Sequence, residues 1–154
     1  MEGVAVVGLG AMGLAMARTL ADAGFAVTGY DISAEQREAF APSVASLGDL
    51  ASTHTVVLSL PDDAAVVAVV DELMDRLERG AVIVDTSTIG AETARRMQAD
   101  AASQGVGYVD APVSGGPAGA ASGTLLMMIG GADRDVDIAT SAARTATSTS
   151  PCQS

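Results

Sequence analysis

The stretch VAVVGLGAMGLAMA, residues 4–17, decides the fold. Its first part, Val4–Val7, is a short apolar run rich in β-branched residues, which predicts a buried strand. Gly8, Gly10 and Gly13 follow directly in the pattern G-x-G-x-x-G. Apolar residues then recur at helical spacing. A strand, a glycine-rich turn and a helix in this order form the context that a dinucleotide-binding fingerprint requires.

Each glycine of this fingerprint has its own physical task. The first permits a tight turn, the second lets backbone N–H groups approach a pyrophosphate, and the third allows the helix to pack closely on the strand. The helix N-terminus adds partial positive charge. The candidate cofactor contacts in this turn are Gly8, Leu9, Gly10, Ala11, Met12 and Gly13. The alternative is a glycine turn that holds no ligand.

Asp31 is the candidate that would choose the cofactor. It follows the second predicted strand, at about the separation from the glycines at which an acidic residue meets the adenosine ribose. A carboxylate there accepts hydrogen bonds from both ribose hydroxyls and repels a 2′-phosphate. The nearest basic residue is Arg37, so NAD is favoured over NADP. The alternative is that Asp31 only caps the turn that follows it.

The rest of the sequence alternates between apolar runs and stretches of helical period. The predicted strands cover residues 4–7, 26–30, a brief segment near 44, 55–60, 81–85, 106–110 and 124–129. The predicted helices cover residues 12–23, 34–40, 62–77 and 91–103, with Ser33 as the cap of the second. Nearly continuous apolar strands between helices indicate a sheet covered on both faces. We therefore predict an α/β fold of the Rossmann type, doubly wound, with a mainly parallel sheet.

Two segments depart from this pattern. The stretch YVDAPVSGGPAGAASGT, residues 108–124, is so rich in glycine and proline after Asp110 that we expect neither helix nor sheet there. We expect its polar backbone to serve a ligand. From Ala132 onward Ser and Thr dominate without a hydrophobic period, as in segments that cannot bury a core. We predict a dinucleotide-binding domain over 1–131 and a disordered or aberrant tail over 132–154.

Composition and charge exclude several classes of partner. The chain has 154 residues, a net charge of −11 and 49% hydrophobic residues. One domain of this length can fill a core, and its charge would repel a nucleic-acid backbone. The longest apolar runs are shorter than the roughly 18 residues of a membrane span, and the N-terminus lacks the basic region of a signal peptide. We expect a cytoplasmic protein with no nucleic-acid or membrane partner.

The sequence also predicts no metal site. His54 is the only histidine and Cys152 the only cysteine, so no paired ligands of the zinc type occur. Alternate aspartates over 133–137 imitate the start of a calcium loop, but Ile138 stands where that loop needs glycine.

Four motifs together resemble the β-hydroxyacid dehydrogenases, the family of 3-hydroxyisobutyrate dehydrogenase, tartronate semialdehyde reductase and, more distantly, 6-phosphogluconate dehydrogenase. VVGLGAMGLAMARTLADAG is similar to the N-terminal signature, except that Thr19 stands where Asn is usual. VVLSLPDDAAV, VDTSTI and VDAPVSGGPAGAASGTL resemble three further segments in the family's order. The resemblance implies that Leu60 and Pro61 line the dinucleotide and that Thr88 approaches the nicotinamide. It implies that Ser114, Gly115 and Gly116 hold a substrate carboxylate.

The resemblance implies an oxidoreductase that transfers hydride between NAD and a small β-hydroxy acid such as 3-hydroxyisobutyrate. Family members form homo-oligomers, and a second, helical domain carries a lysine that acts as acid–base on the substrate hydroxyl. The 154 residues contain no lysine and no asparagine. We therefore expect a truncated cofactor-binding half and assign no catalytic residue.

Two other functions remain open from the sequence. One is a non-catalytic NAD-binding domain or remnant, which the missing lysine favours. The other is a relative of the imine reductases, which share the cofactor domain. The D-A-P-V-S-G-G segment, 110–116, argues against this second function, because an imine offers no carboxylate to hold.

Overall fold

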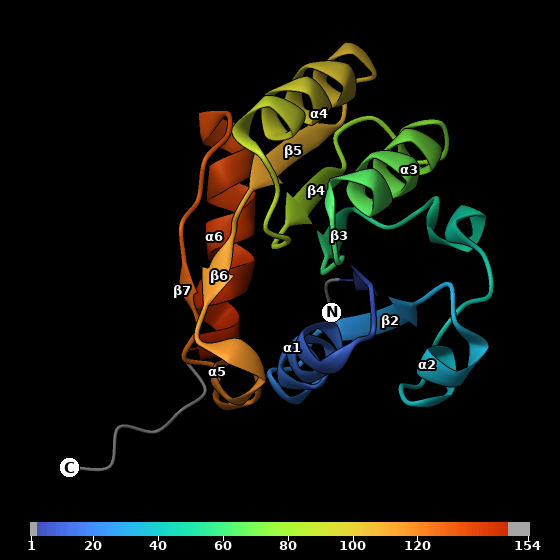
Figure 1. The fold of residues 1–154 in the computed structure, drawn as a ribbon, viewed down its shortest axis with the longest axis vertical. Helices are drawn as coiled ribbons and strands as arrows, with labels where there is room; N and C mark the ends of the chain where they lie inside the picture. The colour runs from blue at the N-terminus through green and yellow to red at the C-terminus, as the bar shows by residue number, and fades with distance from the viewer. Residues whose placement is uncertain (1–2, 148–154) are drawn as a thin grey trace.

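The computed structural model describes residues 3–147 and contains a five-stranded parallel sheet with the strand order β2-β1-β3-β4-β5 (Figure 1). Its strands are β1 (Gly3–Val7), β2 (Ala26–Tyr30), β3 (Thr55–Leu58), β4 (Val82–Asp85) and β5 (Gly107–Asp110). The longer helices are α1 (Ala11–Asp22), α3 (Asp63–Met74), α4 (Ala91–Ser103) and α6 (Asp133–Thr147). The predicted α/β fold of the Rossmann type is confirmed.

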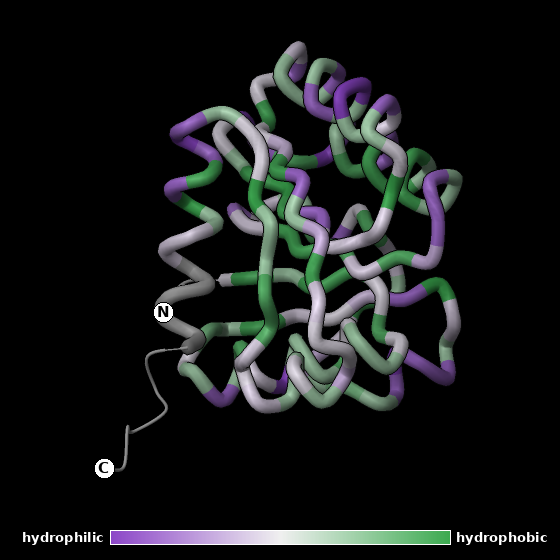
Figure 2. Tube along the Cα trace, turned by 60° about the vertical axis from the view of Figure 1, so that its left-hand side comes forward, coloured by the Kyte–Doolittle hydropathy of each residue, from purple (hydrophilic) through white to green (hydrophobic). Residues whose placement is uncertain are grey.

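Both faces of the sheet are buried, because successive side chains of each strand point to opposite sides. Ala5 and Val7 of β1 pack with the buried residues of α3 and α4, such as Val66 and Met97. Val4 and Val6 pack on the other face, where α1 supplies Ala17. Figure 2 shows the hydrophobic part of the trace running through the middle of the molecule. The sheet is therefore doubly wound.

The short elements near the β2 edge agree with the prediction only in part. Helix α2 (Ala34–Glu38) begins after Ser33, whose side chain accepts a hydrogen bond from the Gln36 N–H, as predicted for a cap. The strand predicted near residue 44 is reduced to an isolated parallel bridge between Gly29 and Ser43. A 3-10 helix, η1 (Leu47–Leu50), follows it.

The expectation that the glycine-rich segment after Asp110 forms neither helix nor sheet is wrong. It contains a short strand, β6 (Val113–Ser114), and a helix, α5 (Gly116–Ser122). Pro117 is accommodated because it lies in the first turn of α5, where its missing N–H has no partner to lose. Gly123 ends the helix in the left-handed conformation.

The last predicted strand also differs. Only β7 (Leu126–Met127) is a strand within residues 124–129, and it pairs antiparallel with β6 in a separate two-stranded sheet. The main sheet therefore ends at β5. A single antiparallel bridge between Asp110 and Gly130 connects the two sheets.

The prediction of a disordered tail from residue 132 is wrong over the described part of that segment. Residues Asp133–Thr147 form α6, and Ala139 is buried with Ile138 beside it against Val82, Val84 and Val109 of the sheet. Residues 148–154, the remainder of the predicted tail, lie outside the described residues, and so does Cys152. Within residues 3–147 no helix combines the length and hydropathy needed to cross a bilayer.

Gly13 is predicted to be indispensable to the fold. A Cβ atom at this position would lie 1.7 Å from the Gly8 carbonyl oxygen, which is backbone and cannot move aside. We expect Gly13→Ala to lower the free energy of unfolding by about 2 kcal/mol or more, as overpacking of a rigid contact does. Urea unfolding followed by circular dichroism measures it. Gly3→Ala is the control, because a Cβ at Gly3 meets nothing within 4 Å, and equal loss in both variants would contradict the argument.

Candidate functional site

A cleft of about 650 Å³ opens where β1, β2 and β3 end, beside the start of α1 and one side of α3. In an open parallel sheet this edge is where ligands bind. Seven of the residues proposed from the sequence line it: Gly8, Gly10, Ala11, Met12, Asp31, Leu60 and Pro61. The others that line it are Val7, Tyr30, Ile32, Leu47, Ser59, Ala65, Ala68, Val69 and Glu72.

The glycine turn is built by backbone contacts that leave no room for side chains. Gly8 has φ 97°, and a Cβ there would lie 2.0 Å from the Ser59 carbonyl oxygen. The Gly8 N–H donates to the Tyr30 carbonyl at 2.8 Å. Gly10 is different, because a Cβ there would meet nothing within 4 Å. The backbone at Gly10 therefore faces open space that a ligand can enter.

The first turn of α1 suits an anion. Gly10 is its N-cap, no side chain caps it, and no acidic residue lies in the first turn. The first N–H groups of a helix have no partner within the helix, and they carry the positive end of its dipole. A phosphate placed against Gly10 would therefore receive hydrogen bonds from backbone donors that the protein leaves available.

Asp31 holds the turn and also lines the cleft. Its Oδ2 accepts a hydrogen bond from the Leu9 N–H at 2.8 Å, and its Oδ1 accepts one from the Ser33 N–H at 2.9 Å. It is not the cap of α2, because Ser33 has that role. Each carboxylate oxygen can accept more than one hydrogen bond, so Asp31 retains acceptor capacity for ribose hydroxyls. Arg37 donates through Nη1 to the carbonyl oxygens of Asp31 and Ile32, at 2.8 and 3.2 Å.

Three proposed cofactor contacts do not line the cleft. Leu9 is fully buried beneath it and reaches Asp31 through its N–H. Gly13 lies behind Gly8. Thr88 is exposed on the turn that follows β4. Ile32, which is 90% exposed at the rim of the cleft, was not predicted from the sequence. A single large apolar residue directly after the acidic residue at a strand end is the signal that could have identified it.

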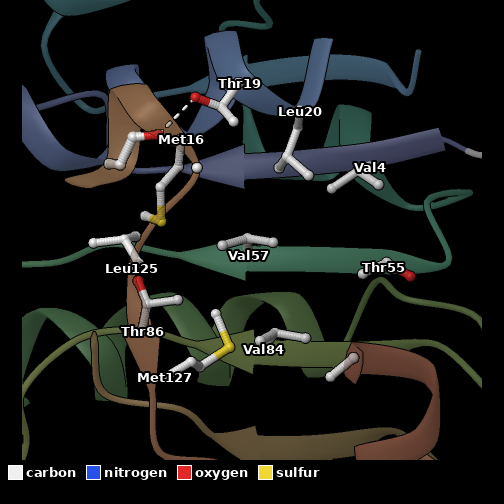
Figure 3. A pocket seen from close by; sticks show the side chains of 13 residues that line it. Val4, Met16, Thr19, Leu20, Thr55, Val57, Val84, Thr86, Leu125 and Met127 are labelled. Atoms are coloured by element: carbon white, nitrogen blue, oxygen red, sulfur yellow. Dashed lines mark hydrogen bonds between the residues drawn. The ribbon is translucent and has the colours of Figure 1, made fainter. Parts of the chain in front are cut away.

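The proposed carboxylate contacts lie on a different part of the surface. Ser114 is in β6, and Gly115 and Gly116, with φ 134° and 66°, turn the chain into α5. Helix α5 packs against α1, where the Thr19 hydroxyl donates to the Ala120 carbonyl at 2.6 Å (Figure 3). This bond fixes the end of the glycine-rich segment to the helix that begins the cleft.

Figure 3 shows a second, smaller hollow between α1 and the sheet. It has a volume of about 140 Å³. Valine side chains of three neighbouring strands line it, Val4, Val57 and Val84, and Leu125 and Met127 line it beside them. Its lining is mainly apolar, and Thr19, Thr55 and Thr86 are its only residues with polar side chains.

A buried acidic group lies beneath the exposed Thr88 and was not anticipated. Asp85 is fully buried at the end of β4. The Tyr108 hydroxyl donates to Asp85 Oδ2 at 2.5 Å, and the Ser87 N–H donates to Oδ1 at 2.9 Å. Burial raises the pKa of the Asp85 carboxyl, and the hydrogen bonds from Tyr108 and Ser87 oppose that rise. Burial likewise raises the pKa of the Asp110 carboxyl, with the Asp85 charge adding to it.

No group of three His, Cys, Asp or Glu side chains in the part of the chain that the structure describes is arranged to hold a metal ion. His54 is exposed, directly before β3.

Residues 3–149 match the family described as the NAD binding domain of 6-phosphogluconate dehydrogenase, and the chain belongs to this family. The family match continues through α6. It therefore extends beyond the domain boundary that the sequence suggested at residue 131.

Similar proteins include several dehydrogenases. A NAD-dependent L-serine dehydrogenase of Pseudomonas aeruginosa is 37% identical over 139 residues, which cover 85% of this chain and 47% of that protein. The structure of a Mycobacterium tuberculosis 3-hydroxyisobutyrate dehydrogenase with L-serine superposes with a TM-score of 0.90 at 30% identity, covering 95% of this chain and 52% of that one. The chain thus spans about half the length of these relatives.

Two other solved structures matter for the alternatives. A Streptomyces aurantiacus imine reductase has a TM-score of 0.84 at 28% identity, over 95% of this chain and 53% of that one. A complex of Psf3 with NADP+ has the same TM-score and identity, over 92% of this chain and 53% of that one. The fold alone therefore does not separate NAD from NADP, or a hydroxy acid from an imine.

The open space at Gly10 gives a direct test of the cleft. We expect Gly10→Ala to weaken NADH binding about tenfold or more, because its methyl group would stand where the backbone must approach a pyrophosphate. The unfolding temperature should change little, since that Cβ meets no neighbour and Gly10 has φ −67°, which alanine adopts readily. Calorimetric titration and thermal unfolding measure the two effects. Unchanged NADH affinity would place the pyrophosphate elsewhere.

Asp85 predicts a particular pH dependence of stability. A carboxyl whose pKa is raised by folding stabilises the protein fully below its unfolded pKa, and this contribution is lost as pH rises through the folded value. We expect the difference in unfolding free energy, wild type minus Asp85→Asn, to fall as pH rises above about 4, the ordinary pKa of an aspartate. Asp63, Asp110 and Tyr108 face the carboxyl and are present in both proteins. A difference that rises with pH would contradict the assignment.

Proposed function

We propose that the cleft binds NAD and that this chain is the cofactor-binding part of an oxidoreductase acting on a small hydroxy acid. The observation that supports this most strongly is the uncapped first turn of α1 facing open space at Gly10, with the Asp31 carboxylate in the same cleft. The cofactor, when bound, would supply the hydride acceptor or donor. The residues of this chain bind and orient it.

Asp31 favours NAD over NADP for an electrostatic reason. Its carboxylate would accept hydrogen bonds from the ribose hydroxyls and would repel a 2′-phosphate. Arg37 is the basic residue nearest in sequence, and its Nη1 is engaged by the carbonyl oxygens of Asp31 and Ile32. Because this nitrogen already donates to two carbonyl oxygens, Arg37 has fewer N–H groups left for a 2′-phosphate. Its other guanidinium N–H groups can still bind that phosphate, so we expect weaker NADP binding and not a complete loss.

Ser114, Gly115 and Gly116 are the proposed site for the substrate carboxylate. The positive φ angles of both glycines support this, because such a turn can present successive backbone N–H groups to one anion. Ser114 is exposed, as a residue that contacts a ligand at the surface must be. The Thr19–Ala120 bond would keep this segment in place relative to α1.

Proton transfer is the step for which these 154 residues offer no lysine. Oxidation of a hydroxy acid requires a group that removes the hydroxyl proton as hydride leaves the carbon. The 154 residues contain no lysine, and the chain spans about half the length of its relatives. We therefore propose that these residues supply cofactor and carboxylate binding, and that a complete reaction needs an acid–base group from elsewhere.

Two other functions follow from the same site. A non-catalytic NAD-binding domain requires the same cleft, and it is the second candidate function for these residues. An imine reductase is favoured by the structural likeness to the Streptomyces protein, while the turn at Ser114–Gly116 favours an acid substrate over an imine.

Cofactor titration is the primary test of the proposed function. We expect the purified chain to bind NADH at least about tenfold more tightly than NADPH, because the repulsion between the partly buried Asp31 carboxylate and a 2′-phosphate is of that size or larger. Asp31→Asn should narrow the difference by removing the charge. Calorimetry with both cofactors measures this. Equal affinity of the wild type for the two would overturn the role of Asp31, and no binding of either would overturn the proposed function.

Turnover assays separate the alternatives. Residues 1–154 alone should oxidise neither 3-hydroxyisobutyrate nor L-serine, nor reduce a cyclic imine, above a control without enzyme. Nicotinamide absorbance reports each reaction. Clear oxidation of a hydroxy acid would show that another residue of this chain replaces lysine, and reduction of the imine would favour the imine reductase relationship.

A further inference from the structure

The turn from Thr86 to Gly90 is held at both ends, although the Thr88 side chain at its centre is exposed. This turn connects β4 to α4 at the same edge of the sheet as the cofactor cleft. At its start, the Thr86 N–H and hydroxyl both donate to the Leu58 carbonyl, at 2.9 and 2.6 Å. These bonds fix the beginning of the turn to the end of β3.

Asp63 holds the other end. Its Oδ2 accepts hydrogen bonds from the Gly90 N–H at 3.2 Å and from the Thr93 hydroxyl at 2.7 Å. Asp63 is the first residue of α3, and Thr93 lies in the first turn of α4. One carboxylate therefore ties the end of the turn to both helices on that face of the sheet.

Ser87 connects the turn to the wall of the cleft. Its N–H donates to Asp85 Oδ1 at 2.9 Å, while its Oγ accepts a hydrogen bond from the Leu60 N–H at 2.9 Å. Ser87 is buried, as is Asp85, whose second oxygen is taken by the Tyr108 hydroxyl. Leu60 and Pro61 line the cleft. The chain of bonds thus runs from β5 through β4 to the residues that face the cofactor.

We propose that Ser87 is a positioning residue, which Asp85 and Tyr108 hold so that Thr88 and the Leu60–Pro61 wall keep a fixed relative position. With the adenosine ribose at Asp31 beside β2 and the pyrophosphate at Gly10, the nicotinamide end of NAD would extend toward the β3 and β4 side of the sheet, where these residues lie. This inference rests on the proposed function. A preformed surface binds more tightly because less conformational entropy is lost on binding. Ser87 itself does not line the cleft, so its hydroxyl acts on the ligand indirectly, through Leu60, through Asp85 and through its own turn.

Two variants remove single atoms from this arrangement. Ser87→Ala removes the acceptor for the Leu60 N–H and leaves the backbone bond to Asp85 available. Tyr108→Phe removes only the hydroxyl on Asp85 and provides the test if the alanine variant does not fold. Ser103→Ala is the matched control, because its hydroxyl bonds the Asp100 carbonyl at the far end of α4.

The test compares NADH with ADP-ribose, which lacks the nicotinamide, by calorimetric titration. We expect Ser87→Ala to weaken NADH binding about three- to tenfold, the range for loss of one hydrogen bond. Tyr108→Phe should act in the same direction. ADP-ribose affinity should change less than NADH affinity in both variants, and Ser103→Ala should change neither. A general loss of structure would lower both affinities together, so the difference between the two ligands identifies positioning.

The outcomes distinguish this inference from the function on which it rests. Wild-type protein that binds neither ligand overturns both. Wild-type protein that binds NADH, with Ser87→Ala and Tyr108→Phe unchanged, overturns only the positioning role. An equal loss of NADH and ADP-ribose affinity in both variants also overturns it, because it would show that the network only supports the fold.

Discussion

The close approach of the backbone at Gly8 and Gly13 is the constraint on which the other parts of this structure depend. A side chain at Gly13 would lie within 1.7 Å of the Gly8 carbonyl, and one at Gly8 within 2.0 Å of the Ser59 carbonyl. The same turn also bonds to Tyr30 and, through Leu9, to Asp31. One short segment therefore joins β1, β2, β3 and α1. Because Gly8 and Gly13 carry no side chains, α1 can begin directly beside the ends of the strands.

This constraint also explains why the site and the fold cannot be separated here. The N–H groups that remain free at the start of α1 are free because the helix begins in a cleft, with no capping side chain. Asp31 reaches the cleft while its carboxylate holds the Leu9 N–H. Ser87 performs a similar double task at the next strand ends, since it bonds both Asp85 and Leu60. Groups that build the sheet edge thus also shape the surface offered to a ligand.

The central sheet and the glycine turn could be predicted from sequence because their signals are local. A β-branched run, a glycine spacing and an acidic residue at a strand end are signals that each lie within a few neighbouring residues. The packing of α6 could not be found in this way. Asp135 of α6 lies against Gly107, and a Cβ atom at Gly107 would be 2.4 Å from the Asp135 carboxyl carbon. Only the fold brings these two positions together, and composition alone indicated a disordered segment.

Helix α5 was missed for a different reason. Glycine and proline predict a break in regular structure, yet a short helix tolerates a proline in its first turn and a glycine just past its end. The Asp85–Tyr108 pair was missed because the partners are on neighbouring strands and far apart in sequence. Sequence patterns located the cleft, and tertiary hydrogen bonds determine how its walls are fixed.

Hydrogen-exchange mass spectrometry with and without NAD tests the central claim most directly, because it reports where the backbone amides are covered. We expect slower exchange in peptides that contain residues 8–14, with smaller effects around 31–33 and 59–62. Peptides from the far ends of the helices, such as those around Ser103, should not change. Protection confined to other segments, or none at saturating NAD, would contradict the claim that the start of α1 forms the cofactor site.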